Sequence, residues 1–372
     1  MKKGEAGLLL PDNQHGGNVH QVAQKLHRNP QTLLDFSSNI NPLGMPKSLR
    51  ERFIKNLDHL SFYPDPEYQT LRENIGQYLD VPSSRIIPGN GASEIIYLLL
   101  NTLRPKNLLI YAPTFSEYEK AARLMNGNVH YYVLPEADGF KPDLTKLAAI
   151  IDRVDCLFLC NPNNPTSTLL SPAELISLVD LAKRKKVTMI LDESFIELTI
   201  PGNSYSMVPW LKSYDNLFII RSFTKILALP GLRLGYGLGP ASWIEKMAQN
   251  KIPWSVNALS CIIGDYVSEI PGFLEKTSCW LAKEKEWLFQ ALLETSSLKP
   301  FPPQSNFILV KIDTPRISAA LLQDKLALQG ILIRNAANFP SLSQQFFRVA
   351  VKDDQSNRRL IEALHTSLDN CL

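Results

Sequence analysis

The feature that most restricts the fold is an alternation of short β-rich runs with helical patterns between about residues 65 and 240. One helical pattern begins at Asp65-Pro66, and another begins at Ser171-Pro172-Ala173-Glu174, a capping box with proline at its first helical position. Such alternation is typical of a mostly parallel sheet covered by helices on both faces, so we expect an α/β fold. The expected strands are residues 85–87, 107–111, 129–133, 155–160, 187–191, 217–220 and 234–238.

The pattern changes after residue 250, which indicates a second structural unit. Two long helical stretches, residues 255–269 and 272–294, come first. Three short strands follow them, near residues 305–312, 331–334 and 346–350. We therefore expect a smaller α+β domain beside the large one, in line with about 150 residues per domain. The expected division is a large domain of residues 45–264 and a discontinuous small domain of residues 1–44 and 265–372.

Charge and cysteine usage exclude several classes of function. The net charge of the 372 residues is only +3, which gives no support to a nucleic-acid-binding surface. The five cysteines form no CxxC pair, so neither a zinc site nor a disulfide framework is indicated, and we expect reduced thiols in the cytoplasm. The apolar run before Pro11 is too short for a signal peptide, and no stretch reaches the roughly 18 apolar residues of a membrane span. We expect a cytoplasmic enzyme without a metal.

Four loops that directly follow predicted strands carry the chemistry, because open α/β sheets bind ligands at the carboxyl ends of their strands. The first, Gly89-Asn90-Gly91-Ala92-Ser93-Glu94, enters a helix whose free N–H groups suit a phosphate, although alone it could be an ordinary glycine turn. The second, Asn161 to Thr166, offers asparagine side chains to a ligand oxygen, or is simply a rigid turn.

The other two loops place charged groups at the same edge of the sheet. Asp192 ends a buried strand and needs a partner, which could be a protonated ring nitrogen or a helix N-terminus. Lys225 precedes a segment that is otherwise apolar and contains glycine. Desolvation in such surroundings lowers the pKa of a lysine and makes the amine competent to form a Schiff base. Ser222 and Arg233 are candidates for binding the same phosphate as the glycine loop.

In this order, the four loops and Gly231-Leu232-Arg233-Leu234-Gly235 resemble the fold-type I pyridoxal-phosphate enzymes of the class I/II aminotransferase family, over nearly the whole chain. The resemblance implies that Lys225 holds the cofactor covalently and acts as the mobile acid/base, and that Asp192 keeps the pyridine nitrogen protonated. It further implies that Asn164 bonds the ring hydroxyl and Phe115 stacks on the ring. The phosphate would be bound by Gly91, Ala92, Ser93, Ser222 and Arg233. Tyr63 matches a tyrosine that family members lend across a dimer interface, so we expect a homodimer with shared sites.

Within that family, the branch acting on phosphorylated substrates fits best, namely the histidinol-phosphate aminotransferases and the threonine-phosphate decarboxylases of cobalamin synthesis. His15-Gly16-Gly17-Asn18 and the segment from Leu34 to Gly44 are similar to the decarboxylases. Phe195 stands where many aminotransferases have a tyrosine that bonds the cofactor hydroxyl. We therefore expect decarboxylation of threonine phosphate to aminopropanol phosphate. The alternatives are a histidinol-phosphate or related aminotransferase, and a serine-phosphate decarboxylase.

Two arginines complete the expected substrate site. Arg348 matches the family's arginine for the α-carboxylate, whose planar fork suits bidentate binding, and Asn164 is expected to orient the substrate with it. Arg334 matches the arginine for the substrate phosphate, with His15 and Asn39 as helpers. Without the resemblance, an arginine at a strand end is more often a surface residue, and a lone histidine is more often part of a loop. Asn13 and Gln14 depart from the small residues that would fit the family before His15.

Overall fold

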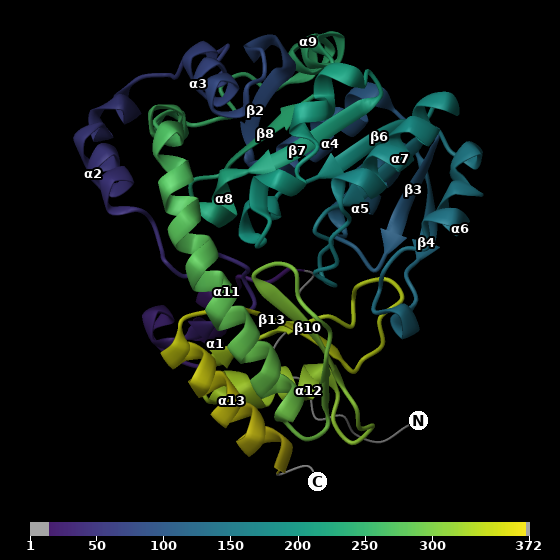
Figure 1. The fold of residues 1–372 in the computed structure, drawn as a ribbon. Coiled ribbons are helices and arrows are strands. Elements are labelled where there is room, and N and C mark those ends of the chain that lie inside the picture. The colour runs from purple at the N-terminus through teal and green to yellow at the C-terminus, as the bar shows by residue number, and fades with distance from the viewer. Residues whose placement is uncertain (1–14, 370–372) are drawn as a thin grey trace.

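The computed structural model of the chain describes residues 15–369 and is built around a seven-stranded sheet (Figure 1). The order of the strands is β2-β8-β7-β6-β5-β3-β4, and only β8 runs against the others. This confirms the predicted α/β fold with a mostly parallel central sheet. The strands are β2 (Ile86–Asn90), β3 (Asn107–Ala112), β4 (Asn128–Val133), β5 (Cys156–Cys160), β6 (Thr188–Asp192), β7 (Leu217–Ser222) and β8 (Leu234–Leu238).

Helices cover both faces of this sheet because its central strands are apolar on both faces. In β5, Leu157 and Leu159 join one hydrophobic cluster, whereas Cys156, Phe158 and Cys160 join the cluster on the opposite face. The first cluster also contains side chains of α7, and the second contains side chains of α4. The helices of this part are α2 (Lys47–Lys55), α3 (Gln69–Leu79), α4 (Gly91–Leu103), α5 (Glu117–Leu124), α6 (Leu144–Ala148), α7 (Pro172–Arg184), α8 (Phe223–Ile226), α9 (Ala241–Asn250) and α10 (Ala258–Cys261).

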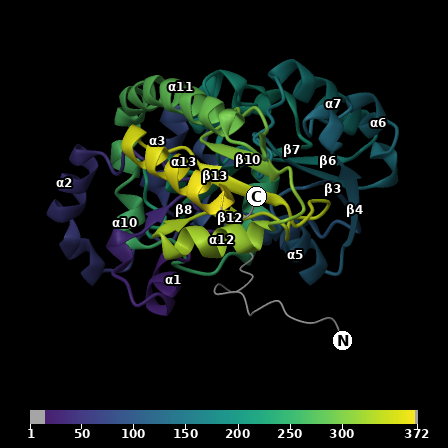
Figure 2. The same cartoon turned by 90° about the horizontal axis from the view of Figure 1, so that it is seen from below.

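A second, antiparallel sheet lies beyond the carboxyl ends of the large sheet's strands, with strand order β12-β13-β10-β9 (Figure 1). Its strands are β9 (Leu298–Pro300), β10 (Phe307–Ile312), β12 (Arg334–Asn335) and β13 (Phe346–Ala350). Its own hydrophobic cluster includes side chains of α11 (Ile270–Glu294), α12 (Ala319–Leu328) and α13 (Asp354–Asp369), which lie together in Figure 2.

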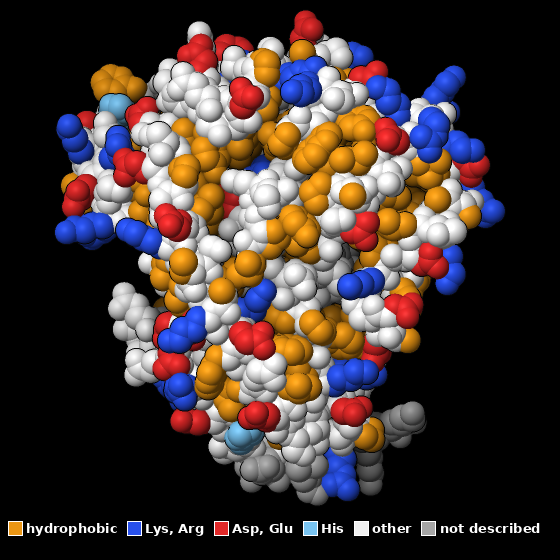
Figure 3. Space-filling model, viewed as in Figure 1, with side chains coloured by type: hydrophobic (Ala, Val, Ile, Leu, Met, Phe, Trp, Pro, Cys, Tyr) orange, Lys and Arg blue, Asp and Glu red, His pale blue; other side chains and the backbone are white. Residues whose placement is uncertain are grey.

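Basic and acidic side chains are interspersed over the face of the molecule shown in Figure 3.

The N-terminal segment joins this smaller part of the molecule. After α1 (Val19–Lys25), the short strand β1 (Leu34–Asp35) pairs in parallel with β11 (Ile331–Leu332). Phe36, which follows β1, is fully buried in the hydrophobic cluster of the smaller sheet. The N-terminal segment from α1 to Phe36 thus packs with the smaller sheet. The division into residues 45–264 and residues 1–44 with 265–372 stays a prediction.

Three expected elements differ in the structure. The helix expected at Asp65 begins at Gln69, because Tyr68 has a left-handed backbone (φ 51°) and the Asp65 carboxylate accepts the N–H of Gln69 in a preceding turn. The helix expected over residues 255–269 is instead α10 followed by a short 3-10 helix, Gly264–Glu269, which packs against α3. The strand expected near residues 331–334 is divided, since β11 pairs with β1 and β12 pairs with β13. Within residues 15–369, no helix is both long and apolar enough to cross a bilayer.

Candidate active site

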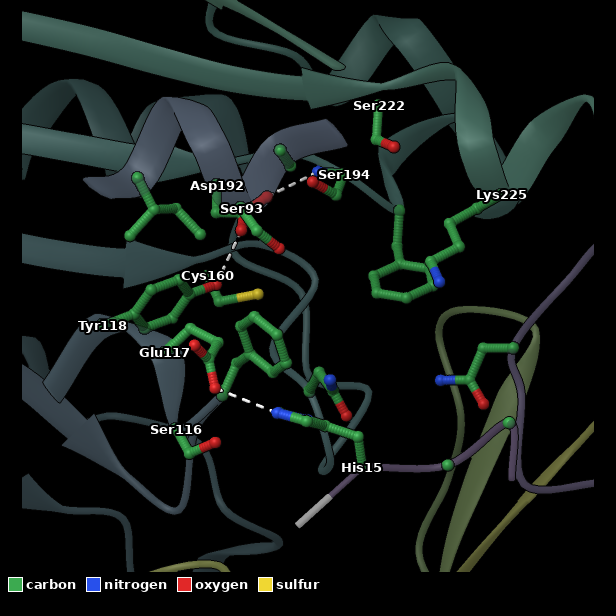
Figure 4. Close-up of a pocket in the computed structure, with 18 of the residues that line it drawn as sticks. His15, Ser93, Ser116, Glu117, Tyr118, Cys160, Asp192, Ser194, Ser222 and Lys225 are labelled. Atoms are coloured by element: carbon green, nitrogen blue, oxygen red, sulfur yellow. Dashed lines mark hydrogen bonds and ion pairs between the residues drawn. The ribbon is translucent and has the colours of Figure 1, made fainter. Parts of the chain in front are cut away.

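A cavity of about 760 Å³ lies between the strand ends of the large sheet and the smaller sheet, within the usual size range of small-molecule sites (Figure 4). Most of the residues expected to form a site lie around it: His15, Asn39, Ala92, Ser93, Phe115, Asn164, Asp192, Ser222, Lys225, Arg233, Arg334 and Arg348. Gly91 and Tyr63 are the exceptions among the expected residues. Tyr63 is 80% exposed and rests against Trp254, with 4.8 Å between the ring centroids.

The glycine loop brings Arg233 against the N-terminus of α4. β2 leads directly into this helix through Gly91, whose φ of +77° suits glycine, and a Cβ at Gly91 would overlap the Arg233 guanidinium. Ala92 and Ser93, in the first turn, line the cavity. The positive end of a thirteen-residue helix and a guanidinium thus meet at one place, which is an arrangement suited to a phosphate.

Asp192 is buried at the carboxyl end of β6, where two donors hold its carboxylate (Figure 4). The Tyr118 hydroxyl donates to Oδ2 at 2.7 Å, and the Ser194 backbone N–H donates to Oδ1 at 2.9 Å. Burial raises the pKa of Asp192, whereas these hydrogen bonds and the positive charge of Lys225 oppose the rise. A cationic ring nitrogen is the kind of group that would match this carboxylate.

Lys225 reaches the cavity from α8, the short helix after β7. The Ser222 hydroxyl begins this helix by accepting the Thr224 N–H at 3.2 Å. The Lys225 Nζ lies 5.8 Å from the centroid of the Phe195 ring. Burial, together with the cations Arg348 and Arg233, lowers the pKa of Lys225 to about 8, so a part of the amine is unprotonated and nucleophilic near neutral pH.

Arg334 and Arg348 are paired across adjacent strands, so their side chains share one face of the smaller sheet. Both residues are buried, with exposed fractions of 4% and 5%. Arg348 donates from Nη1 to Asn164 Oδ1 and from Nη2 to the Ser37 carbonyl at 2.8 Å. Its Nε has no partner, and no carboxylate of residues 15–369 lies within ion-pairing distance of it. Burial and the neighbouring charge of Arg334 lower the pKa of Arg348, which indicates a site that an anionic ligand would complete.

The other end of the cavity offers further polar groups. Asn39 is buried, and neither its amide nitrogen nor its amide oxygen has a partner in the described part of the chain. His15 Nε2 lies 2.9 Å from Glu117 Oε1, which links the N-terminal segment to α5 (Figure 4). Burial lowers the pKa of His15 although the Glu117 charge opposes this shift. Asn13 and Gln14 lie outside the described residues.

Two residues of the site, Glu117 and Tyr118, were not identified from the sequence. Glu117 accepts hydrogen bonds from the Tyr97 hydroxyl at 2.8 Å and from the Lys120 amine at 2.7 Å, besides its contact with His15. Both residues belong to the segment from Ala112 to Tyr118, in which only Phe115 was considered. A carboxylate and a tyrosine in the first turn of a helix after a buried strand were the available signal. Among residues 15–369, no cluster of His, Cys, Asp and Glu suited to a metal ion is found.

Residues 31–364 match the family described as aminotransferase class I and II. The chain is 37% identical over 362 residues to the threonine-phosphate decarboxylase of Salmonella typhimurium, an alignment that covers 97% of this chain and 98% of that protein. The structure of a histidinol-phosphate aminotransferase from Clostridium acetobutylicum is similar, with a TM-score of 0.85 at 35% identity, covering 91% of this chain and 100% of the other. The L-threonine-O-3-phosphate decarboxylase from Porphyromonas gingivalis gives a TM-score of 0.80 at 27% identity, with the same coverages.

The charges around Lys225 predict its titration. In the cofactor-free protein, its amine should react with a limiting amount of acetic anhydride with a pH midpoint near 8, as followed by mass spectrometry of the Lys225 peptide. Arg348→Gln should move that midpoint upward, because removing a neighbouring cation makes the protonated amine less unfavourable. A midpoint unchanged by Arg348→Gln would contradict this account of the site.

Proposed function

The chain belongs to the aminotransferase class I and II family, and we propose that it is a pyridoxal-phosphate-dependent carboxy-lyase acting on L-threonine O-3-phosphate. Its products are CO2 and (R)-1-amino-2-propanol O-phosphate, for the nucleotide loop of cobalamin. The observation that carries the substrate class is the cross-strand pair of Arg334 and Arg348, two buried cations on one wall of the cavity. A small molecule with a phosphate at one end and a carboxylate at the other matches this pair.

The cavity residues fit pyridoxal phosphate. The phosphate would be held at the N-terminus of α4, by Ala92 and Ser93, together with Ser222 and Arg233. Asp192 would face the ring nitrogen, and Phe115 would cover one face of the ring. The Asn164 side-chain oxygen already accepts a hydrogen bond from Arg348, so its side-chain nitrogen remains to donate to the ring hydroxyl. The Lys225 amine would attach the cofactor covalently.

The chain's own groups then determine which bond of the substrate breaks. When bound, pyridoxal phosphate supplies an electron-accepting ring that stabilises the electron pair left by breaking the Cα bond perpendicular to it. Arg348 binds the carboxylate and Arg334 the phosphate, with His15 and Asn39 beside it, so the substrate's rotation about its long axis is set from both ends. The bond between Cα and the carboxylate carbon breaks, CO2 leaves, and Lys225 Nζ delivers a proton to Cα.

Two observations bear on the choice between decarboxylation and amino transfer. The decarboxylase from Salmonella typhimurium is 37% identical over nearly its full length, whereas histidinol-phosphate aminotransferases from Methanococcus aeolicus and Nicotiana plumbaginifolia are 28% and 32% identical. Phe195 is buried against Phe307, with 5.2 Å between the ring centroids, and offers no hydroxyl to the cofactor. The structural similarity to the Clostridium acetobutylicum enzyme keeps a histidinol-phosphate aminotransferase as the second candidate.

A homodimer with shared active sites is part of the proposal. Large apolar side chains are exposed on the segment from α2 to Tyr63 and on the loop around Trp254, and such a concentration is typical of an interaction surface. These side chains are Ile54, Leu57, Leu60, Phe62, Tyr63, Ile252 and Trp254. If a second copy covers these side chains, the Tyr63 of each subunit would lie at the cavity of the other subunit. A cytoplasmic location is also part of the proposal. The four cysteines of the described part are free thiols, which supports it.

The reaction is tested by incubating the protein and pyridoxal phosphate with L-threonine O-3-phosphate and measuring CO2 and the amine phosphate by mass spectrometry. Equal amounts of both products are expected, and Lys225→Ala should abolish them. L-serine O-phosphate tests the pocket for one methyl group, which is worth only about 1–3 kcal/mol. Turnover of histidinol phosphate with 2-oxoglutarate, without CO2 from either phosphoamino acid, would favour the aminotransferase instead.

Shared sites are tested by mixing two variants that each have little activity. Tyr63→Ala and Lys225→Ala subunits, dissociated and reassembled together, form hybrid dimers in which one site has both the tyrosine and the lysine. Random reassembly should restore about a quarter of the wild-type activity, since half the dimers are hybrids with one intact site each. A monomer by light scattering, or no activity from hybrids shown to form, would contradict the shared site.

A further inference from the structure

Tyr118 is fixed by its surroundings with its hydroxyl against Asp192. Its ring is fully buried, stacks on Phe158 at 4.0 Å with an interplanar angle of 25°, and meets the edge of Phe115 at 5.6 Å. The hydroxyl donates to Asp192 Oδ2 at 2.7 Å, as Figure 4 shows. A tyrosine packed against two rings cannot turn its hydroxyl away without disturbing its neighbours, so the packing favours this hydrogen bond.

The groups around Asp192 show what this hydrogen bond does. On β5, the buried Cys160 thiol adds no charge, and on α8 Lys225 is the nearby cation. On the loop after β6, Ser194 contributes its backbone N–H, while its hydroxyl has no partner among residues 15–369. Burial works against the ionised carboxylate, and a hydrogen bond donated to it works in its favour. The hydrogen bond that Tyr118 donates therefore directly supports the charge of Asp192.

We propose that Tyr118 is a positioning residue that keeps Asp192 ionised and oriented toward the ring nitrogen of the cofactor. The inference rests on the proposed cofactor and on no particular substrate or reaction. Without the Tyr118 hydroxyl, Asp192 loses a donor in a buried place and becomes more easily protonated. A neutral acid holds a cationic ring nitrogen less well than a carboxylate does, so the affinity for pyridoxal phosphate falls.

Tyr118→Phe tests this with little disturbance, because the ring and its stacking on Phe158 remain. Tyr111→Phe is the matched control, since Tyr111 is also buried and its hydroxyl has no partner among the described residues. Pyridoxal phosphate is titrated into the cofactor-free proteins and followed by quenching of tryptophan fluorescence. We expect a dissociation constant at least about tenfold higher for Tyr118→Phe, as for loss of a hydrogen bond to a charged group, and an unchanged one for Tyr111→Phe.

Two further measurements separate positioning from a general structural effect. In the Asp192→Asn protein, adding Tyr118→Phe should change the affinity by less than about twofold, because the two side chains act as one unit. A cofactor analogue with carbon in place of the ring nitrogen should bind wild type and Tyr118→Phe equally. Equal affinity of both proteins for pyridoxal phosphate, or an equal loss for the analogue, would overturn the inference and leave the proposed function standing. If wild type itself binds no pyridoxal phosphate, the cofactor assignment fails as well.

Discussion

The organisation of the site depends on a buried cation that has no anionic partner among residues 15–369. Arg348 is almost completely enclosed and neighbours Arg334, yet its contacts are an amide oxygen and a backbone carbonyl. Burying such a charge is unfavourable, and leaving it unpaired adds to the penalty. Because these two acceptors come from the large sheet's loop and from the N-terminal segment, Arg348 joins three distant parts of the chain at the place where an anion would bind. If Arg348 served only the stability of the fold, a carboxylate of the chain would be expected beside its guanidinium.

Strand geometry divides the remaining charges between two faces. Successive residues of a strand point to opposite faces, so Asp192 and Ser222 face the cavity while the next residue, Glu193, and the preceding one, Arg221, face away. Glu193 and Arg221 form a buried ion pair, with 3.0 Å between Oε2 and Nε, which ties the ends of β6 and β7 together. The charge of Arg221 is thus paired with carboxylates away from the cavity, whereas Lys225, Arg233, Arg334 and Arg348 line the cavity.

Much of this was predictable from the sequence, and the rest has identifiable physical causes. Apolar runs and glycine turns located the seven strands and the loops with Asp192 and Lys225, because both signals are local. The predicted start of α3 was wrong because Tyr68 adopts a left-handed backbone conformation, which the spacing of apolar residues does not indicate. Tyr118 was missed because its role depends on which face of α5 turns to the sheet. The contact of Arg348 with the Ser37 carbonyl joins residues 311 positions apart, and a backbone acceptor leaves no trace in a sequence pattern.

The central claim is that Arg334 and Arg348 bind opposite ends of one substrate, and kinetics with two substrates test it most directly. The ratio kcat/KM is measured for L-threonine O-3-phosphate and for unphosphorylated L-threonine with wild type, Arg334→Gln and Arg348→Gln. The account predicts that Arg334→Gln removes most of the preference for the phosphorylated substrate. Arg348→Gln should lower kcat/KM for both substrates by the same factor, since both carry the carboxylate. Equal losses on both substrates for Arg334→Gln, or a loss confined to the phosphorylated one for Arg348→Gln, would contradict it.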